Sequence, residues 1–74
     1  MNTYIIYMLC PFGYYDYMGN FDGDTEAEAI QAAIDFYVGN IDDDFKEDTR
    51  ESIEEFYRGA EYKAEPYVEI LEEV

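Results

Sequence analysis

Apolar residues in the first third of the chain alternate with a period of two, which predicts two strands joined by a turn. Residues 3–10 are apolar or aromatic on both alternating faces, which is typical of a central strand. Residues 11–13, Pro-Phe-Gly, form a turn signal, and residues 14–21 read as a second strand. In that strand Tyr15, Tyr17 and Phe21 alternate with mostly polar positions, so one face is expected to meet solvent, and Gly19 indicates either a bulge or a weak point of the strand. The pattern predicts an antiparallel hairpin.

After residue 24 the apolar spacing changes to steps of three and four, which predicts a helix. Thr25 followed by Glu28 is a capping box, in which the Thr25 hydroxyl accepts from the Glu28 N–H and the Glu28 side chain reaches back. The helix is expected to run to about Val38, and residues 39–40, Gly-Asn, end it. Its predicted buried face consists of Ile30, Ala33, Ile34, Tyr37 and Val38.

Residues 42–55, DDDFKEDTRESIEE, combine few apolar positions with many carboxylates, and we call them the acidic segment. Two helix starts are equally consistent: a continuous helix from about Asp42, or a shorter one from Asp48 with Glu51 at its third position. Arg58 and Gly59 form a stop signal. If residues 42–57 form a helix, six of their side chains share a single inward face: Phe45, Thr49, Ser52, Ile53, Phe56 and Tyr57.

The last third of the chain predicts one more strand. Residues 60–65 are either a loop or a short extended piece, and Pro66 argues against a central strand there. The strand is expected at residues 67–71, with an extension to residue 74 left open. Acids near the end would guard an edge strand against pairing with another chain: Glu69, Glu72 and Glu73.

This order of elements, ββααβ, predicts a single α+β domain over residues 1–74. We expect a three-stranded antiparallel sheet with strand order 2-1-3 and both helices on one face. That order puts the strand with two apolar faces in the middle and the weaker strands at the edges. A chain of 74 residues forms only a small core, so stability should be modest.

The charge changes what this fold is expected to do. Nineteen Asp and Glu face four Lys and Arg, a formal net charge of -15, while 49% of residues are hydrophobic, so the chain should fold despite self-repulsion. Such a charge argues against direct binding to nucleic acid or to an anionic membrane, since both require basic patches. It favours a basic protein partner, divalent cations or simple solubility.

Residues that support catalysis or metal binding are scarce. The chain has no His, and its one cysteine, Cys10, lies in an apolar run, which predicts a buried thiol in a reducing compartment. Residues 20–28 loosely resemble the start of a calcium loop, but a turn followed by a helix cap explains them better. We expect no metal and no cofactor, and a protein that is not an enzyme. With its own initiator Met, no signal peptide and no apolar run of about 18 residues, the chain is expected in the cytoplasm.

The acidic segment generates the main functional hypothesis. As a helix it aligns Asp44, Asp48, Glu51 and Glu55 on one outward stripe whose members rise by about 6 Å every four residues. Phosphates on a DNA strand advance by about 3.4 Å, so the stripe roughly matches every second phosphate. Mimicry of nucleic acid and plain solubility remain equally balanced interpretations. The predicted partner-binding carboxylates are Asp42, Asp43, Asp44, Glu47, Asp48, Glu51, Glu54 and Glu55.

Tyrosine is the second informative residue type, with nine in the chain. Most are expected at the edges of the core. Tyr14, Tyr15 and Tyr17 predict an aromatic patch on the hairpin, and tyrosine is enriched at protein interfaces because it is large, rigid and able to hydrogen-bond. Tyr15 and Tyr17 are therefore also candidate partner-binding residues. If this patch is the contact surface, the protein is an adaptor or a viral assembly protein.

In size, charge and aromatic content the chain resembles small phage-encoded inhibitors of host defence, namely DNA-mimic anti-restriction proteins and anti-CRISPR proteins. The acidic segment, the helix capped by TEAE and the net charge of -15 carry this resemblance. It is a likeness of composition over the whole chain, and no residue role is transferred. It implies a stoichiometric inhibitor in the host cytoplasm that occupies the basic groove of a CRISPR effector or restriction-type nuclease. The protein is expected to be a monomer or a homodimer.

Overall fold

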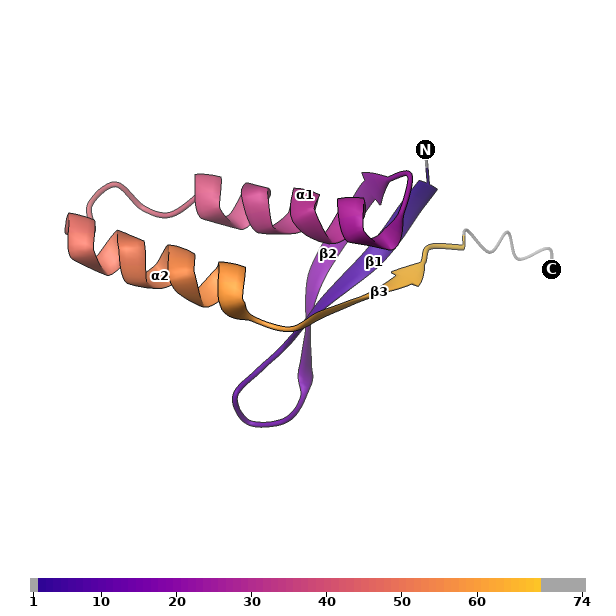
Figure 1. Ribbon diagram of the computed structural model, residues 1–74, viewed down its shortest axis with the longest axis horizontal. Helices are drawn as coiled ribbons and strands as arrows, with labels where there is room; N and C mark the ends of the chain where they lie inside the picture. The colour runs from indigo at the N-terminus through magenta and orange to yellow at the C-terminus, as the bar shows by residue number, and fades with distance from the viewer. Residues whose placement is uncertain (1, 69–74) are drawn as a thin grey trace, which may run out of the picture.

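Three antiparallel strands and two helices make up the computed structural model, which describes residues 2–68 (Figure 1). The central strand of the sheet is β1, flanked by β2 and β3, so the predicted order 2-1-3 is confirmed. In chain order the elements are β1 (Asn2–Leu9), β2 (Tyr15–Gly23), α1 (Glu26–Gly39), α2 (Glu47–Gly59) and β3 (Tyr62–Pro66).

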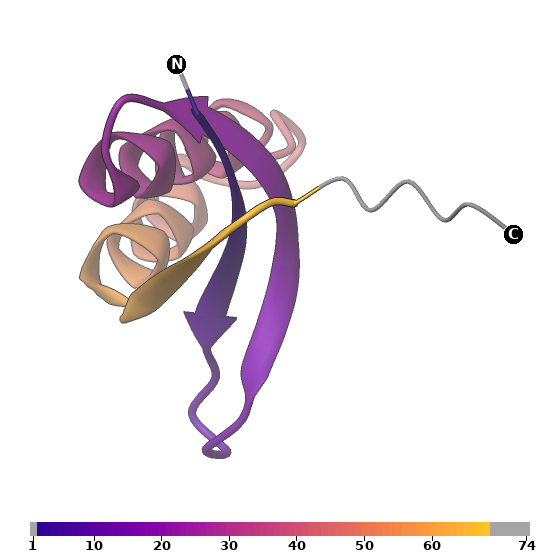
Figure 2. The ribbon, with the colours of Figure 1, turned by 90° about the vertical axis from the view of Figure 1, so that its right-hand side faces the viewer.

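Both helices lie on the same side of the sheet, as predicted, and within residues 2–68 no helix covers its other side (Figure 2). The two helices run antiparallel, and their connected ends extend past the edge of the sheet (Figure 1). The core forms where α1 crosses the strands. Two alanines of α1 let the helix backbone come close to the sheet. The buried core cluster is Ile6, Met8, Met18, Ala29 and Ala33.

A bulge in β2 decides which of its side chains face the helices. The pairing with β1 shifts between Ile6 and Tyr7, because Ile6 faces Gly19 while Tyr7 faces Tyr17. Gly19 has a φ of 124°, a backbone conformation that favours glycine, so the predicted bulge is confirmed. The extra residue reverses the alternation. Tyr15 and Tyr17 therefore lie on the open face, whereas the later Phe21 packs against the core on the helix side.

The N-terminal cap of α1 is built largely as predicted. The Thr25 hydroxyl accepts from the Glu28 N–H at 3.2 Å. The Glu28 carboxylate accepts from the Asp24 N–H at 2.7 Å, one residue before the cap. Ala29, which was not part of the predicted buried face, is fully buried together with Ala33 because both approach the sheet directly.

The predicted inward face of the second helix is wrong in part. α2 begins at Glu47, with Lys46 as its N-cap, one residue before the shorter of the two predicted helices. Phe45 therefore precedes the helix, in a turn closed by a 3.2 Å bond from its N–H to the Asp42 carbonyl, and its side chain is 47% exposed. No residue of α2 is fully buried, and Phe56 is exposed as well. The reason is that most of α2 lies beyond the sheet and packs on α1, while Tyr57 near its end reaches the core.

The predicted position of the last strand is also wrong. β3 is Tyr62–Pro66, whereas Tyr67 and Val68 form no strand, and the rest of the predicted strand lies outside the described residues. The pairing with β1 places Tyr62 and Ala64 under the helices, where both pack against the core. Pro66 ends β3, consistent with an edge position. The proposed edge guards Glu69, Glu72 and Glu73 lie outside the described residues.

Candidate partner-binding surfaces

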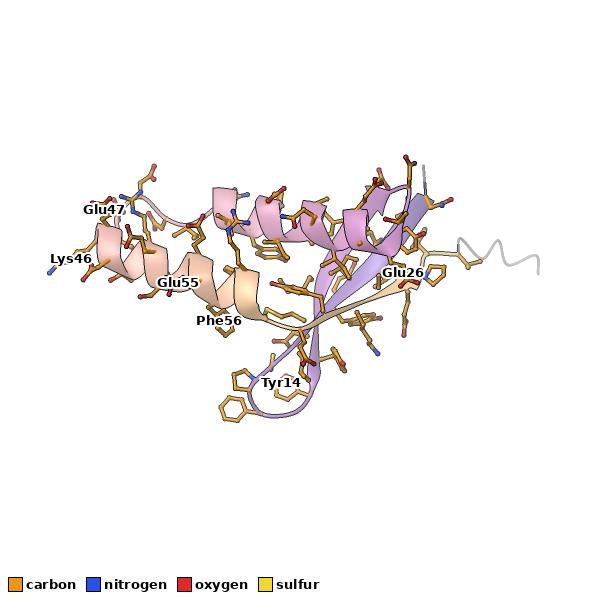
Figure 3. All side chains as sticks on the ribbon, in the orientation of Figure 1. Tyr14, Glu26, Lys46, Glu47, Glu55 and Phe56 are labelled. Carbon is orange, nitrogen blue, oxygen red and sulfur yellow. The ribbon has the colours of Figure 1, made fainter. Side chains whose placement is uncertain are left out.

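The acidic segment occupies the outer end of the helix pair. Its first half forms the connection between the helices and its second half forms most of α2. Figure 3 shows Lys46 and Glu47 at the end of the molecule farthest from Glu26, with Glu55 farther along α2. The fold therefore gathers these carboxylates on a part of the molecule that projects beyond the sheet.

Most of the charge in the acidic segment is uncompensated. Eight of the 19 acidic residues fall within residues 42–55, against Lys46 and Arg50, which gives 2 − 8 = −6 for the segment. All eight are exposed except the half-buried Glu54. Within residues 2–68, two of the eight form ion pairs, Asp43 with Arg50 at 3.7 Å and Glu54 with Arg58 at 3.4 Å. Both pairs are partly exposed, so solvent screens them and leaves most of the negative field in place.

The predicted stripe of four acids is shorter in the structure. Asp44 lies before α2, where its N–H bonds the Asp42 carboxylate at 2.9 Å. Asp48, Glu51 and Glu55 do share the helix, at steps of three and four, and rise over about 10 Å. Asp48 also accepts from the Thr49 N–H at 2.9 Å at the start of α2, where the helix dipole favours a negative charge.

Ring stacking, an ion pair and a hydrogen bond from a side chain to the backbone hold the C-terminal end of α2 to α1 and β3. The rings of Tyr37 and Tyr57 stack with centroids 5.6 Å apart, and Arg58 lies 3.8 Å from Asp35 of α1. The Tyr62 hydroxyl donates to the Tyr57 carbonyl at 2.6 Å. Burial, followed by the nearby Tyr57, raises the pKa of Tyr62, so the hydroxyl stays protonated and keeps donating. These contacts fix the direction in which the acidic segment projects.

The hairpin tyrosines divide between two places. Tyr15 and Tyr17 lie on the open face of the sheet, where Tyr17 is 63% exposed and its ring meets Tyr7 edge-on at 6.1 Å. Lys63 of β3 places its ammonium 4.6 Å from the Tyr15 ring and 5.0 Å from the Tyr7 ring. Tyr14, the third member of the predicted patch, belongs to the turn between the strands. The sequence did not indicate Lys63, because its place beside the tyrosines depends on the register of β3.

Cys10 sits at the base of the hairpin as a protected thiol. Its Sγ donates to the Asp16 carboxylate at 2.9 Å. That hydrogen bond, then burial and then the charge of Asp16 raise the pKa of the Cys10 thiol. The thiol therefore stays protonated at neutral pH and is a poor nucleophile.

The described residues offer little for metal chemistry. Within residues 2–68, no three side chains of the types that ligate metals come together as a metal site. In the calcium-like sequence, Asp22 accepts from the Thr3 hydroxyl at 2.6 Å and Glu28 serves the α1 cap. In the same part of the chain, neither helix has the length and apolar character needed to cross a bilayer.

Comparisons of the chain with protein-family models, with curated proteins and with solved structures found no match.

Proposed function

We propose that this protein is a non-enzymatic, stoichiometric inhibitor that binds a nucleic-acid-binding protein through its acidic segment. The partner is a CRISPR effector or a restriction-type nuclease, and the segment occupies the basic groove in which that partner holds DNA or RNA. The carboxylates before and along α2 take the place of backbone phosphates and pair with Lys and Arg of the groove.

One observation carries the proposal: the net charge of −6 of the acidic segment sits on the projecting end of the helix pair, largely without internal ion pairs. A charged end that extends past the sheet can enter a concave groove before the rest of the domain meets its walls. A concentrated field of one sign also steers an oppositely charged partner and speeds association.

The exposed character of α2 supports the same proposal. A helix with no fully buried residue adds little to the core. Many residues of α2 are instead carboxylates, which repel one another. Such an arrangement costs stability unless a cationic partner neutralises the charge. Self-repulsion in the free protein would thus be relieved on binding.

Affinity capture from a bacterial lysate, eluted with a salt gradient, tests the proposal. We expect a nucleic-acid-binding protein whose retention falls steeply with salt, because the contacts are between exposed charges. Added DNA or RNA should compete with the captured partner. Charge reversal by Asp43→Lys, Asp44→Lys and Glu47→Lys should abolish capture. Retention that is unchanged between low and high salt contradicts mimicry.

The exposed aromatic hairpin supports a second candidate function. Phe12 in the turn is 87% exposed, and Tyr15 and Tyr17 remain accessible on the open face. A protein–protein adaptor or viral assembly protein would use this surface. In that case Tyr15→Ala and Tyr17→Ala would abolish capture of a partner, whereas the three charge reversals would leave it intact.

A further inference from the structure

A groove separates the turn of the hairpin from the end of α2. Leu9, Cys10 and Pro11 form one wall, while Phe56 and Ala60 contribute to the other, and together with neighbouring residues they line a space of about 580 Å³ that is open to solvent. Figure 3 shows Phe56 below α2, on the side of the helix that faces Tyr14 and the hairpin turn. Segments far apart in the sequence thus build a mostly apolar concavity next to the acidic segment.

Backbone hydrogen bonds hold the two walls in place. The Leu9 N–H donates to the Glu61 carbonyl at 2.8 Å and joins the walls at their base. The hairpin wall is closed by bonds from the Cys10 N–H to the Tyr14 carbonyl at 2.7 Å and from the Gly13 N–H to the Cys10 carbonyl at 2.9 Å. The groove is therefore largely formed before any ligand arrives, which lowers the entropic cost of filling it.

The charged groups that line the groove are both acidic. Glu55 comes from α2 and Glu61 from the segment before β3, and both are exposed. Within residues 2–68, neither forms an ion pair with a basic side chain. Phe56 adds an aromatic ring that is 47% exposed. An apolar floor, an accessible ring and two carboxylates are together complementary to one kind of side chain, which has an apolar stem and a cationic head.

We infer that this groove binds an arginine side chain of the protein partner. The methylene stem covers the apolar wall, the planar guanidinium stacks on Phe56, and its donors meet Glu55 and Glu61. The flat, forked head of arginine can address two carboxylates at once while stacking, which the compact ammonium of lysine cannot do. The inference rests on the proposed function in one respect, that the partner is a basic protein, and it names the anchor of that contact.

The test uses two-dimensional ¹⁵N NMR of the full chain with a defined probe, the peptide acetyl-Leu-Arg-amide. The citrulline analogue has nearly the same shape as the arginine peptide but no charge. The lysine analogue has the charge but lacks the planar guanidinium group, and spermidine supplies positive charge without a peptide. We expect the arginine peptide to shift the amide signals of Gly13, Gly59 and Glu61 with millimolar affinity, more strongly than those of Asp43 or Asp44. The citrulline and lysine analogues should bind several-fold more weakly, and spermidine should favour the acidic segment.

Substitutions assign the contacts. Glu55→Gln, Glu61→Gln and Phe56→Ala should each weaken the arginine peptide by about two- to fivefold, as expected for exposed charge and cation–π contacts. Glu26→Gln, which removes one charge at the far end of the molecule, is the matched control and should leave the affinity unchanged. Because Phe56 is exposed and the two glutamates lie on the surface, all three variants should remain folded, and their amide spectra verify this.

Three outcomes would overturn the inference: equal binding of the citrulline analogue, shifts confined to residues 42–54, or no loss on replacing Glu55 and Glu61. None of these touches the proposed function, since capture through the acidic segment is tested separately by Asp43→Lys, Asp44→Lys and Glu47→Lys. Conversely, if those reversals leave capture intact while the peptide still binds the groove, the inference about the groove is supported and nucleic-acid mimicry is contradicted.

Discussion

α1 and α2 have nearly the same length, 14 and 13 residues, but opposite roles in the fold. α1 lies across the sheet, has a side-chain cap and buries Ala29, Ala33 and Ile34. α2 packs mainly on α1 and reaches the sheet at Tyr57, lacks a side-chain cap bond and buries nothing completely. The helix that stabilises the domain is thus distinct from the helix that carries most of the acidic segment. This division lets charge accumulate where it disturbs the core least.

The largest expected difference comes from the same truncation made in each helix. Ile34 is buried in α1, whereas Ile53 is only half-buried in α2. Ile34→Ala should lower the free energy of unfolding by about 2–4 kcal/mol, and Ile53→Ala by less than about 1.5 kcal/mol. Urea denaturation of both variants measures the difference. Equal losses would mean that α2 is as much a part of the core as α1.

A second pair of variants compares the two ends of α1. A Cβ on Gly23 would lie 2.6 Å from the Ala29 nitrogen and 2.9 Å from the Glu28 Cβ, whereas a Cβ on Gly39 meets nothing within 4 Å. Gly23→Ala should therefore cost about 1–3 kcal/mol, because the backbone at the start of α1 must shift. Gly39→Ala should be neutral or stabilise by up to about 1 kcal/mol. Thermal unfolding distinguishes the two, and a harmless Gly23→Ala would show that α1 is not pressed against the end of β2.

The caps provide a smaller contrast. Thr25→Ala removes the side-chain bond at the start of α1 and should cost about 1 kcal/mol. Lys46→Asn introduces such a bond at the start of α2 and should stabilise by a few tenths to about 1 kcal/mol, although it makes the net charge more negative. Chemical denaturation at moderate salt, which screens repulsion between exposed charges, separates the effect of the cap on stability from the effect of the lost positive charge. A destabilising Lys46→Asn would indicate that repulsion in the acidic segment outweighs capping.

The smallest expected effect appears at alkaline pH, at the contact that joins α2 to the sheet. The pKa of Tyr62 is raised in the folded state above its ordinary value of 10.0. The unfolded chain therefore loses this proton first, so the stability that Tyr62 contributes is complete below about pH 10 and declines as pH rises through the folded pKa. Tyr62→Phe should cost about 1 kcal/mol at pH 7 through the lost bond to the Tyr57 carbonyl.

Measuring the free energy of unfolding of wild type and Tyr62→Phe across the alkaline range isolates the titration of Tyr62 from that of the other tyrosines. The free energy of unfolding of Tyr62→Phe should fall less steeply above pH 10 than that of the wild type. Parallel curves would show that Tyr62 titrates alike in the folded and unfolded chains.

The sequence was sufficient to predict most of the architecture. Local signals decide the hairpin, the Thr25 cap and the central place of β1, because each depends on a few adjacent residues. The position of β3 was missed because Lys63, Glu65 and Pro66 make Tyr62–Pro66 look polar, while pairing with β1 and burial of Tyr62 and Ala64 determine the strand. Phe45 was wrongly expected on the inward face of the second helix, because the spacing of apolar residues shows neither that α2 begins only at Glu47 nor that this end of α2 lies beyond the sheet.

The candidate surfaces divide in the same way. The clustering of carboxylates is a property of neighbouring residues and was visible as such. The groove is not, because it brings Leu9 and Pro11 next to Phe56 and Glu61, which requires the tertiary fold. The bulge at Gly19 likewise separated Tyr17 from Phe21, which simple alternation had placed on one face.

The most direct test of the central claim asks whether the position of the charge matters or only its amount. The triple variant Asp43→Asn, Asp44→Asn, Glu47→Gln removes three charges from the acidic segment, and Asp22→Asn, Glu26→Gln, Glu65→Gln removes three exposed charges elsewhere. The dissociation constant of the captured partner, measured by calorimetry at one salt concentration, should rise by about tenfold or more for the first variant and by less than about twofold for the second. Equal changes in the two variants would contradict the account, because the charge would then act as a general solubilising coat.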